Sequence, residues 1–167
     1  MVPADYAFVL HTANPVTGQR GEVFGEMVVG LGETLVGNHP GRPLTFTVPS
    51  GQTPQVLTYP SKRVGLFAPA SASLIVRSDS NGEDLETFAG AGLYDSVLVD
   101  KAVTGVLDYS QEPLMWEAPL RDALLAETAA LGVEIEAAFG GVPQDIEGVW
   151  TAGHYTVVQS RPQVLPN

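Results

Sequence analysis

The spacing of apolar residues predicts a chain built mainly from short strands. Apolar and polar residues alternate through 6–12 and again through 22–29, with the turn-forming run 14–18 between them, which is typical of half-buried strands joined by a turn. Shorter runs of similar character predict further strands at 44–48, 55–58 and 73–78, short strand character within the irregular stretch 97–109, and two closing strands at 144–150 and 155–161.

One segment has the period of a helix instead. From Pro119 to Phe139 the residues that fall on one side are apolar, and they are Leu120, Leu124, Leu131, Ile135 and Phe139. A proline suits the first helical position, and Gly140-Gly141 ends the segment. We interpret the stripe as core, and we predict an α+β fold of mainly antiparallel strands with one long helix (about 119–139) and a C-terminal β-hairpin.

The closing hairpin carries polar side chains at alternating positions. Asp145 and Glu147 share one face of the first strand, and Gln159 and Arg161 share one face of the second. Whether the two faces coincide depends on the length of the loop between the strands.

Two loop lengths are compatible with the residues at 151–155. A two-residue loop pairs Thr151 with His154 and places Gln159 on the face opposite Glu147. A three-residue loop at 152–154 instead places Glu147 across from Gln159, and Asp145 across from Arg161. Because Gly153 suits the left-handed position of such a loop, we predict the three-residue loop.

In that register the hairpin face has two chemical interpretations. Oxygen ligands such as Glu147 and Gln159 suit Mg²⁺, which shares its coordination with substrate phosphates, and Arg161 can neutralise those phosphates. The alternative is a solvated edge with ordinary cross-strand ion pairs, worth roughly 0.2–1 kcal/mol each.

A second candidate for phosphate binding lies in the middle of the chain. The apolar strand at 73–78 delivers Arg77 to the edge of a loop rich in acids, hydroxyl groups and glycines. Its guanidinium is a permanently charged fork that fits phosphate oxygens. The small residues Ser78, Ser80 and Gly82 allow backbone N–H groups to approach the same ligand.

Several blocks of the chain resemble one known family. They are Arg-Ser-Asp-Ser-Asn-Gly-Glu-Asp-Leu-Glu from residue 77, Ala-Gly-Ala-Gly-Leu-Tyr-Asp-Ser-Val from residue 89, and further blocks at 5–15, 30–37, 41–44, 59–63, 144–148 and 157–162. In this order they resemble the nucleotide-binding domain of the alpha-glucan, water dikinases, the plant and algal enzymes that phosphorylate starch. The resemblance covers nearly the whole chain and is more specific than any single short motif.

The resemblance implies part of an ATP-grasp-like domain that binds MgATP. The residues that it implies for the nucleotide are Arg77 and Gly90 near the phosphates, Glu147 and Gln159 as ligands of Mg²⁺ and phosphate, and Arg161 as a closing arginine, with Asp145 supporting them. Glycine-rich Gly30-Leu31-Gly32-Glu33, ahead of a possible helical turn at 33–36, lacks the ending of a Walker loop. Its glycines serve either tight packing or nucleotide contact.

In this family the β-phosphate of ATP passes through a phosphohistidine to the glucan, and the γ-phosphate passes to water. We expect residues 1–167 to be a partial domain without a catalytic residue, because the upstream lobe, the phosphohistidine domain and the starch-binding parts belong elsewhere. The piece alone is then expected to be inactive. Alternatives are a phosphoglucan, water dikinase, a phosphoenolpyruvate synthase-like domain and a non-catalytic fold fragment. The family implies a chloroplast location, although no transit peptide is recognisable.

Composition narrows the possible partners. The 8 basic and 19 acidic residues give a net charge of −11, which disfavours nucleic acid and anionic membranes. The chain has no cysteine, so disulfides and thiolate chemistry are excluded. An anionic nucleotide remains a suitable ligand where a few cations and Mg²⁺ concentrate positive charge.

The remaining basic residues receive ordinary structural interpretations. We expect His11 to be a buried, hydrogen-bonded core residue, His39 to lie in a surface turn and His154 to lie at the hairpin tip. None resembles a phosphohistidine motif. The pair Lys62-Arg63 is expected to be solvated.

Overall fold

A six-stranded antiparallel sheet forms the centre of the molecule, in the order β10-β9-β1-β2-β3-β4. The computed structural model describes residues 2–37, 39–69, 74–77 and 96–166. The strands of this sheet are β1 (Tyr6–Ala13), β2 (Arg20–Val29), β3 (Leu44–Pro49), β4 (Gln55–Thr58), β9 (Gln144–Thr151) and β10 (His154–Pro162). The two closing strands therefore return to pair beside the first strand of the chain.

The other elements are shorter, apart from one helix. Two small sheets pair β5 (Val64–Phe67) with β8 (Val103–Val106), and β6 (Ile75–Arg77) with β7 (Ser96–Leu98). The helices are α1 (Glu33–Val36), α2 (Pro113–Trp116) and α3 (Ala118–Ala138). The predicted α+β class is confirmed, as are the strands and the long helix, to within about two residues at most ends. Strand β5 and helix α2 were not predicted from the sequence.

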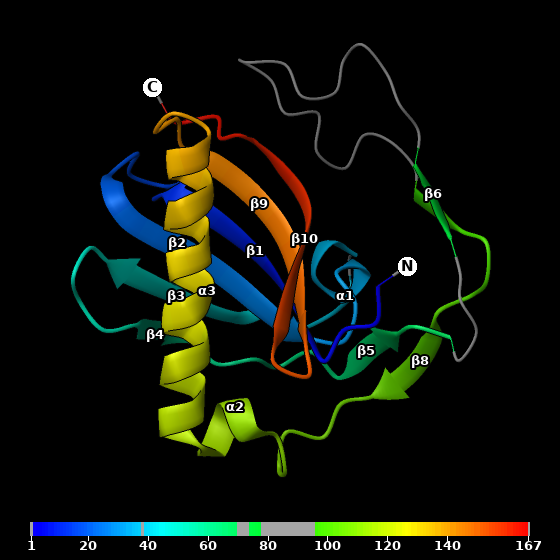
Figure 1. Cartoon of the computed structure of the whole chain (residues 1–167). Coiled ribbons are helices and arrows are strands. Elements are labelled where there is room, and N and C mark those ends of the chain that lie inside the picture. Colours follow the sequence, from blue (N-terminus) through cyan, green and yellow to red (C-terminus); the bar gives the residue numbers. More distant parts are fainter. Residues whose placement is uncertain (1, 38, 70–73, 78–95, 167) are drawn as a thin grey trace.

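Helix α3 packs across one face of the sheet, over β1, β2, β3 and β9 (Figure 1). Its buried residues are Leu124, Leu125, Thr128, Ala129 and Gly132. The predicted stripe is therefore partly wrong, because Leu120 and Phe139 at the helix ends are 44% and 57% exposed. Side chains at the ends of a long helix reach past the surface that its middle turns cover.

Small residues bring α3 close to the sheet. A Cβ atom on Gly132 would lie 3.3 Å from Leu10 and 3.5 Å from Thr12, so the helix backbone contacts strand side chains directly. Thr128 satisfies its hydroxyl within the same interface, where Oγ1 donates to the carbonyl of Leu124 at 2.6 Å. Packing at this distance leaves little room for larger residues.

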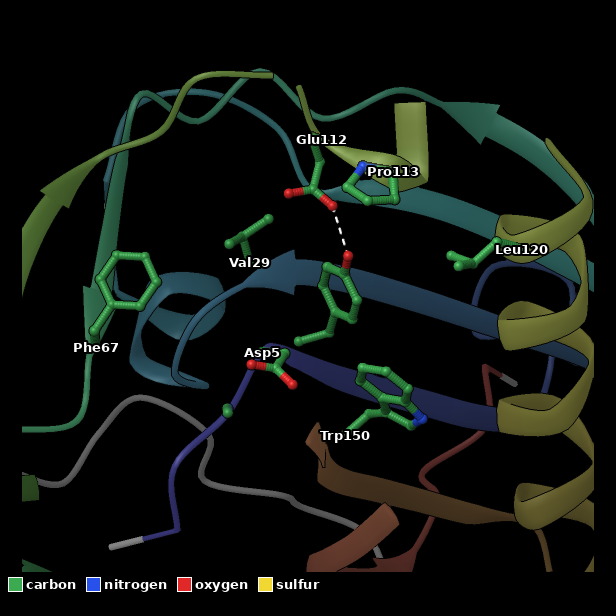
Figure 2. A pocket seen from close by; sticks show the side chains of 9 residues that line it. Asp5, Val29, Phe67, Glu112, Pro113, Leu120 and Trp150 are labelled. Atoms are coloured by element: carbon green, nitrogen blue, oxygen red, sulfur yellow. Dashed lines mark hydrogen bonds between the residues drawn. The ribbon is translucent and has the colours of Figure 1, made fainter. Parts of the chain in front are cut away.

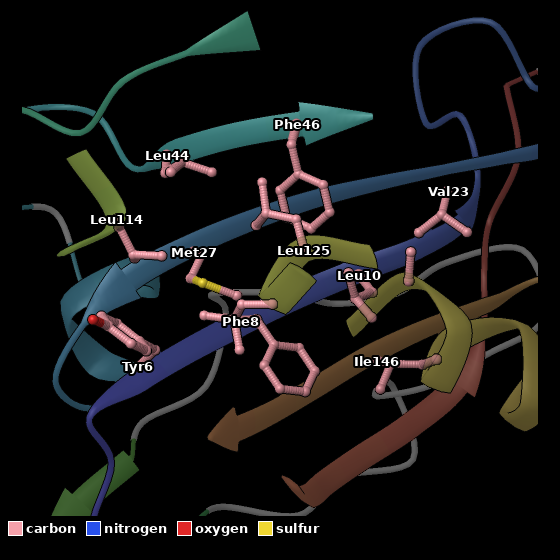
Figure 3. Close-up of a cluster of buried hydrophobic side chains, with 12 residues drawn as sticks. Tyr6, Phe8, Leu10, Val23, Met27, Leu44, Phe46, Leu114, Leu125 and Ile146 are labelled. Carbon is pink, nitrogen blue, oxygen red and sulfur yellow. The ribbon is translucent and has the colours of Figure 1, made fainter. Parts of the chain in front are cut away.

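The core between α3 and the sheet is mainly apolar (Figure 3). Phe8, Leu10 and Phe46 come from the sheet, and Leu125 comes from the helix; each is at most 1% exposed. Two strand glycines make space for the rings: a Cβ atom on Gly148 would lie 2.3 Å from the ring of Phe8, and one on Gly25 would lie 2.3 Å from Phe46.

The closing hairpin corrects the predicted loop but keeps the predicted pairs. Thr151 pairs with His154, so the loop has two residues, Ala152 and Gly153, both with positive φ (49° and 86°), as a tight hairpin turn requires. A bulge between Val157 and Gln159 adds one residue to β10. This extra residue shifts the strand so that Gln159 faces Glu147 and Arg161 faces Asp145.

The glycine-rich segment after β2 packs tightly against β5. Gly30 has φ 87°, and a Cβ atom there would lie 2.4 Å from the carbonyl oxygen of Leu66. The N–H of Leu31 donates to the same carbonyl at 2.7 Å. For Gly30, these contacts support the interpretation that the glycine allows tight packing of the chain. Among the described residues, no helix has the length and apolarity that crossing a bilayer requires.

Candidate functional site

The sheet face opposite α3 carries the candidate site, and we call it the polar face. It is defined by two neighbouring rows of cross-strand partners: Thr45, Glu26, Val9, Glu147 and Gln159 in the first row, and Thr47, Phe24, His11, Asp145 and Arg161 in the second. At one end of this face Ala7, Val28 and Val149 form a small apolar cluster with Leu35 of α1.

The first row brings the two predicted metal ligands together. Glu147 of β9 lies directly across from Gln159 of β10, and Val9 of β1 lies on the other side of Glu147. Directly opposed residues of antiparallel strands have Cβ atoms about 4.5–5.5 Å apart. The pairing therefore puts a carboxylate side chain and an amide side chain at neighbouring positions on one face.

The second row contains a close ion pair. Arg161 Nη2 lies 2.9 Å from Asp145 Oδ2, and Nε donates to the same oxygen at 3.0 Å. Both side chains are only 16% exposed. The carboxylate of Asp145 holds the guanidinium of Arg161 in this row, and the supporting role of Asp145 in a nucleotide site stays a prediction.

His11 extends the second row and corrects a prediction. It was expected in the core, yet it lies on the polar face, 25% exposed, with Nε2 3.7 Å from Asp145 Oδ1. Its Nδ1 is buried and has no hydrogen-bond partner among the described residues. Burial lowers the pKa of His11 below its ordinary value, with Arg161 acting in the same direction and Asp145 opposing it.

Glu26 of the first row carries a carboxyl group that is influenced by the charge of Lys62. Burial raises the pKa of the Glu26 carboxyl, while the nearby Lys62 ammonium opposes that shift. Lys62 is 4% exposed, and its Nζ donates to the carbonyl of His39 at 2.9 Å. The expected solvated pair at 62–63 is therefore wrong for Lys62.

The burial of Lys62 could not be predicted from the sequence, because the residues around it show neither the helical nor the strand spacing of apolar positions. Its burial depends on the loop that ends at Gly41 (φ 103°), where an added Cβ atom would lie 2.6 Å from the backbone of Lys62. Glu26, by contrast, was detectable from strand alternation, which places it on the same face as Phe24.

The remaining predicted residues lie elsewhere in the chain. Arg77 is the last residue of β6, and its backbone pairs with Ser96 of β7 in a small sheet separate from the central one. Its side chain and the whole of Gly90 lie outside the described residues. Their assignment to a nucleotide stays a prediction.

The donor set suits a cation that is shared with a ligand. Among the described residues, no three His, Cys, Asp or Glu side chains gather as a metal cluster. Glu147 and Gln159 supply two oxygen donors, and Mg²⁺ typically takes its other positions from water and substrate phosphates. Arg161 in the next row adds a cation beside these oxygen donors.

Comparison with curated proteins gives matches along nearly the entire chain. It is 52% identical over 98% of its length to alpha-glucan water dikinase 2 of Arabidopsis thaliana. This chain is related to the alpha-glucan water dikinases. Similarity to the chloroplastic enzymes of Solanum tuberosum (52%) and Arabidopsis thaliana (alpha-glucan water dikinase 1, 51%) covers the same 98%. The resemblance predicted from the sequence is confirmed.

The chain spans only a small part of these relatives, 11–13% of their length. Two of the three are named as chloroplastic, in agreement with the plastid location expected from the resemblance. No family model matches the chain.

Proposed function

We propose that this chain forms the sheet-bearing half of a MgATP site in an alpha-glucan water dikinase. The observation that supports this proposal most directly is that two residues with oxygen donors, Glu147 and Gln159, lie on the same sheet face as Arg161. The guanidinium of Arg161 is fixed there by its ion pair with Asp145. An isolated cross-strand ion pair would need no neighbouring oxygen donors. The 52% identity to alpha-glucan water dikinases favours this class over the related alternatives.

Each residue has a distinct role in the proposed site. Glu147 and Gln159 hold Mg²⁺ together with phosphate oxygens of the nucleotide. Arg161 neutralises the phosphates, and Asp145 fixes the orientation of its guanidinium through the contacts at 2.9 and 3.0 Å. Arg77 and Gly90 are assigned to the phosphates on the sequence resemblance. The two arginines balance the charges of Glu147 and Asp145, so bound Mg²⁺ would supply the net positive charge that an anionic nucleotide needs in a chain whose net charge is −11.

The reaction belongs to the whole protein. Mg²⁺ supplies charge neutralisation between the phosphoryl groups when it is bound. The phosphoryl groups would pass through a histidine in another domain to a glucan, and to water, in the plastid. A second lobe would close over the polar face, since ATP-grasp sites lie between two lobes. The chain alone therefore provides half of the site, and we expect it to bind nucleotide weakly and to show no turnover.

Calorimetric titration of MgATP into the chain tests this assignment. We expect weak, magnesium-dependent binding that is lost in Glu147→Ala and in Arg161→Ala. The control matched in charge to Glu147→Ala is Glu134→Ala at an exposed position of α3, and the control matched to Arg161→Ala is Arg20→Ala at an exposed position of β2. Equal binding by the unaltered chain and both site variants would overturn the residue assignment.

A further inference from the structure

A cavity of about 430 Å³ opens on the other side of the sheet from the polar face, beside α2. Tyr6 of β1 and Trp150 of β9 pair across neighbouring strands and reach it on the face that α3 covers. Its size falls within the usual range of small-molecule sites. The proposed MgATP site does not use these residues.

Aromatic rings form the walls of this cavity. The rings of Tyr6 and Trp150 lie 5.6 Å apart with their planes tilted by 32°. Figure 2 shows Phe67 on the opposite side of the opening from Trp150. A ligand in this position would meet ring surfaces on two sides.

Two carboxylates line the cavity, and hydrogen bonds hold each of them: Glu112 accepts from Tyr6 and a backbone N–H, and Asp5 accepts from a backbone N–H. Glu112 Oε1 accepts the Tyr6 hydroxyl at 2.6 Å and the N–H of Leu114 at 3.4 Å. Asp5 Oδ2 accepts the N–H of Ala152 at 2.9 Å. In each group one oxygen is held by the protein, and in Figure 2 the other oxygen of Glu112 points away from Tyr6.

The cavity is electrically negative. Among the residues that the structure describes, those that line the cavity include Asp5 and Glu112 but neither lysine nor arginine. Burial raises the pKa of Tyr6, and the charges of Glu112 and Asp5 raise it further. A phosphate or nucleotide would be repelled here, so the ligand must be neutral or positively charged.

We propose that this cavity binds an alkylammonium group. Tyr and Trp faces attract such cations through their ring quadrupoles, and the attraction grows where the cation is partly desolvated. The fixed carboxylates add charge attraction from two edges of the same space. A neutral ligand would gain binding free energy from contact with the rings alone, because the charges of Asp5 and Glu112 would not attract it.

The test compares two probes of the same shape that differ in charge. Choline carries a quaternary ammonium group, and 3,3-dimethylbutan-1-ol is its neutral counterpart. Binding is followed by the indole NMR signal of Trp150 in a Trp116→Phe background, since Trp116 is 69% exposed and does not line the cavity. We expect choline to shift the Trp150 signal at lower concentration than the alcohol and to lose affinity as salt rises.

Two variants that each remove one negative charge separate the electrostatic attraction of choline from its contact with the aromatic rings. Glu112→Gln keeps an acceptor for Tyr6 while removing the charge, and it should weaken choline binding by about threefold or more without changing alcohol binding. Glu134→Gln on the outer side of α3 should leave the binding of both probes unchanged.

A second comparison identifies the natural source of the ammonium group. If a lysine-containing tripeptide binds more tightly than butylammonium, the source is a protein side chain; if the two bind equally, the source is a free amine. Three results would overturn the proposal: equal binding of choline and the alcohol, no shift of the Trp150 signal with either probe, or binding of the neutral sugar maltose that is tighter than binding of choline.

Discussion

The two faces of the central sheet are built by the same strands and serve different ends. Under α3, most of the alternating residues are apolar and almost completely buried, as Phe8, Leu10 and Ile146 illustrate. On the polar face several of the intervening positions carry charged or amide side chains, including Asp145 and Arg161 at 16% exposure. Strand alternation thus lets one face supply stability while the other keeps charges at fixed positions.

This difference also explains why the partly buried charges are tolerated. The ion pair of Asp145 and Arg161 would be a poor source of stability by itself, because desolvation offsets much of its attraction. The apolar face supplies the folding free energy that holds the pair in place. Substitutions on the two faces should therefore separate stability from ligand binding.

The largest effect on stability is expected from the centre of the apolar face. Leu125 is 0% exposed, so Leu125→Ala should lower the free energy of unfolding by about 2–5 kcal/mol through lost burial and a residual cavity. Urea denaturation measures this change. Val133→Ala, on the same helix at a position 56% exposed, should change it little, and equal losses would contradict the placement of α3.

A somewhat smaller loss is expected where a glycine makes room for an aromatic ring. Gly148→Ala places a methyl group against Phe8, where the gap is 2.3 Å, and should cost about 1–3 kcal/mol by overpacking. Gly32→Ala is the control, because Gly32 has helical φ and no atom within 4 Å of the added Cβ. Thermal unfolding distinguishes the two, and recovery of stability in Gly148→Ala with Phe8→Leu would identify the ring as the cause.

On the polar face, loss of Arg161 should reduce stability less than loss of Leu125. Arg161→Ala leaves the Asp145 carboxylate without its partner at 2.9 Å, which costs about 2 kcal/mol for a hydrogen bond to a charged group. Chemical denaturation at neutral pH checks the value. Arg20→Ala, an exposed arginine with one contact of 3.3 Å to a carbonyl, should be nearly neutral; similar losses in both variants would argue against a structural ion pair.

The smallest expected effect is a change of slope with pH. The unfolded chain protonates His11 near its ordinary pKa of 6.5, whereas burial lowers the folded pKa. Stability contributed by neutral His11 is therefore complete above pH 6.5 and is lost as pH falls through the folded pKa. His11→Gln should flatten the dependence of unfolding free energy on pH in this window, and an unchanged slope would contradict the burial of the imidazole.

The sequence predicted well what depends on local periodicity. Alternation identified the strands of the central sheet, and the helical period with its flanking proline and glycines identified α3. The pairing of Glu147 with Gln159 was predicted from the wrong loop, because an inserted residue at the bulge near Val158 compensated for the shorter turn. Neither the bulge nor the short loop leaves a periodic signal.

Features that depend on distant contacts were not predictable. His11 lies beside Asp145 because β9 pairs with β1 across most of the chain length, and local sequence does not specify such a pairing. The burial of Lys62 depends on the loop at Gly41. The cavity beside Tyr6 needs Glu112 and Trp150 from separate elements, so only the folded arrangement brings it together.

Paramagnetic relaxation tests most directly whether the polar face is the nucleotide face. ATP is added with Mn²⁺ in place of Mg²⁺, and line broadening is mapped by NMR on both faces of the sheet. The account predicts that signals of Gln159, Glu147 and the neighbouring Val9 broaden first, while those of Val133 and Glu134 on the outside of α3 stay sharp. Broadening centred on α3, or spread evenly over the surface, would contradict a MgATP site on the polar face.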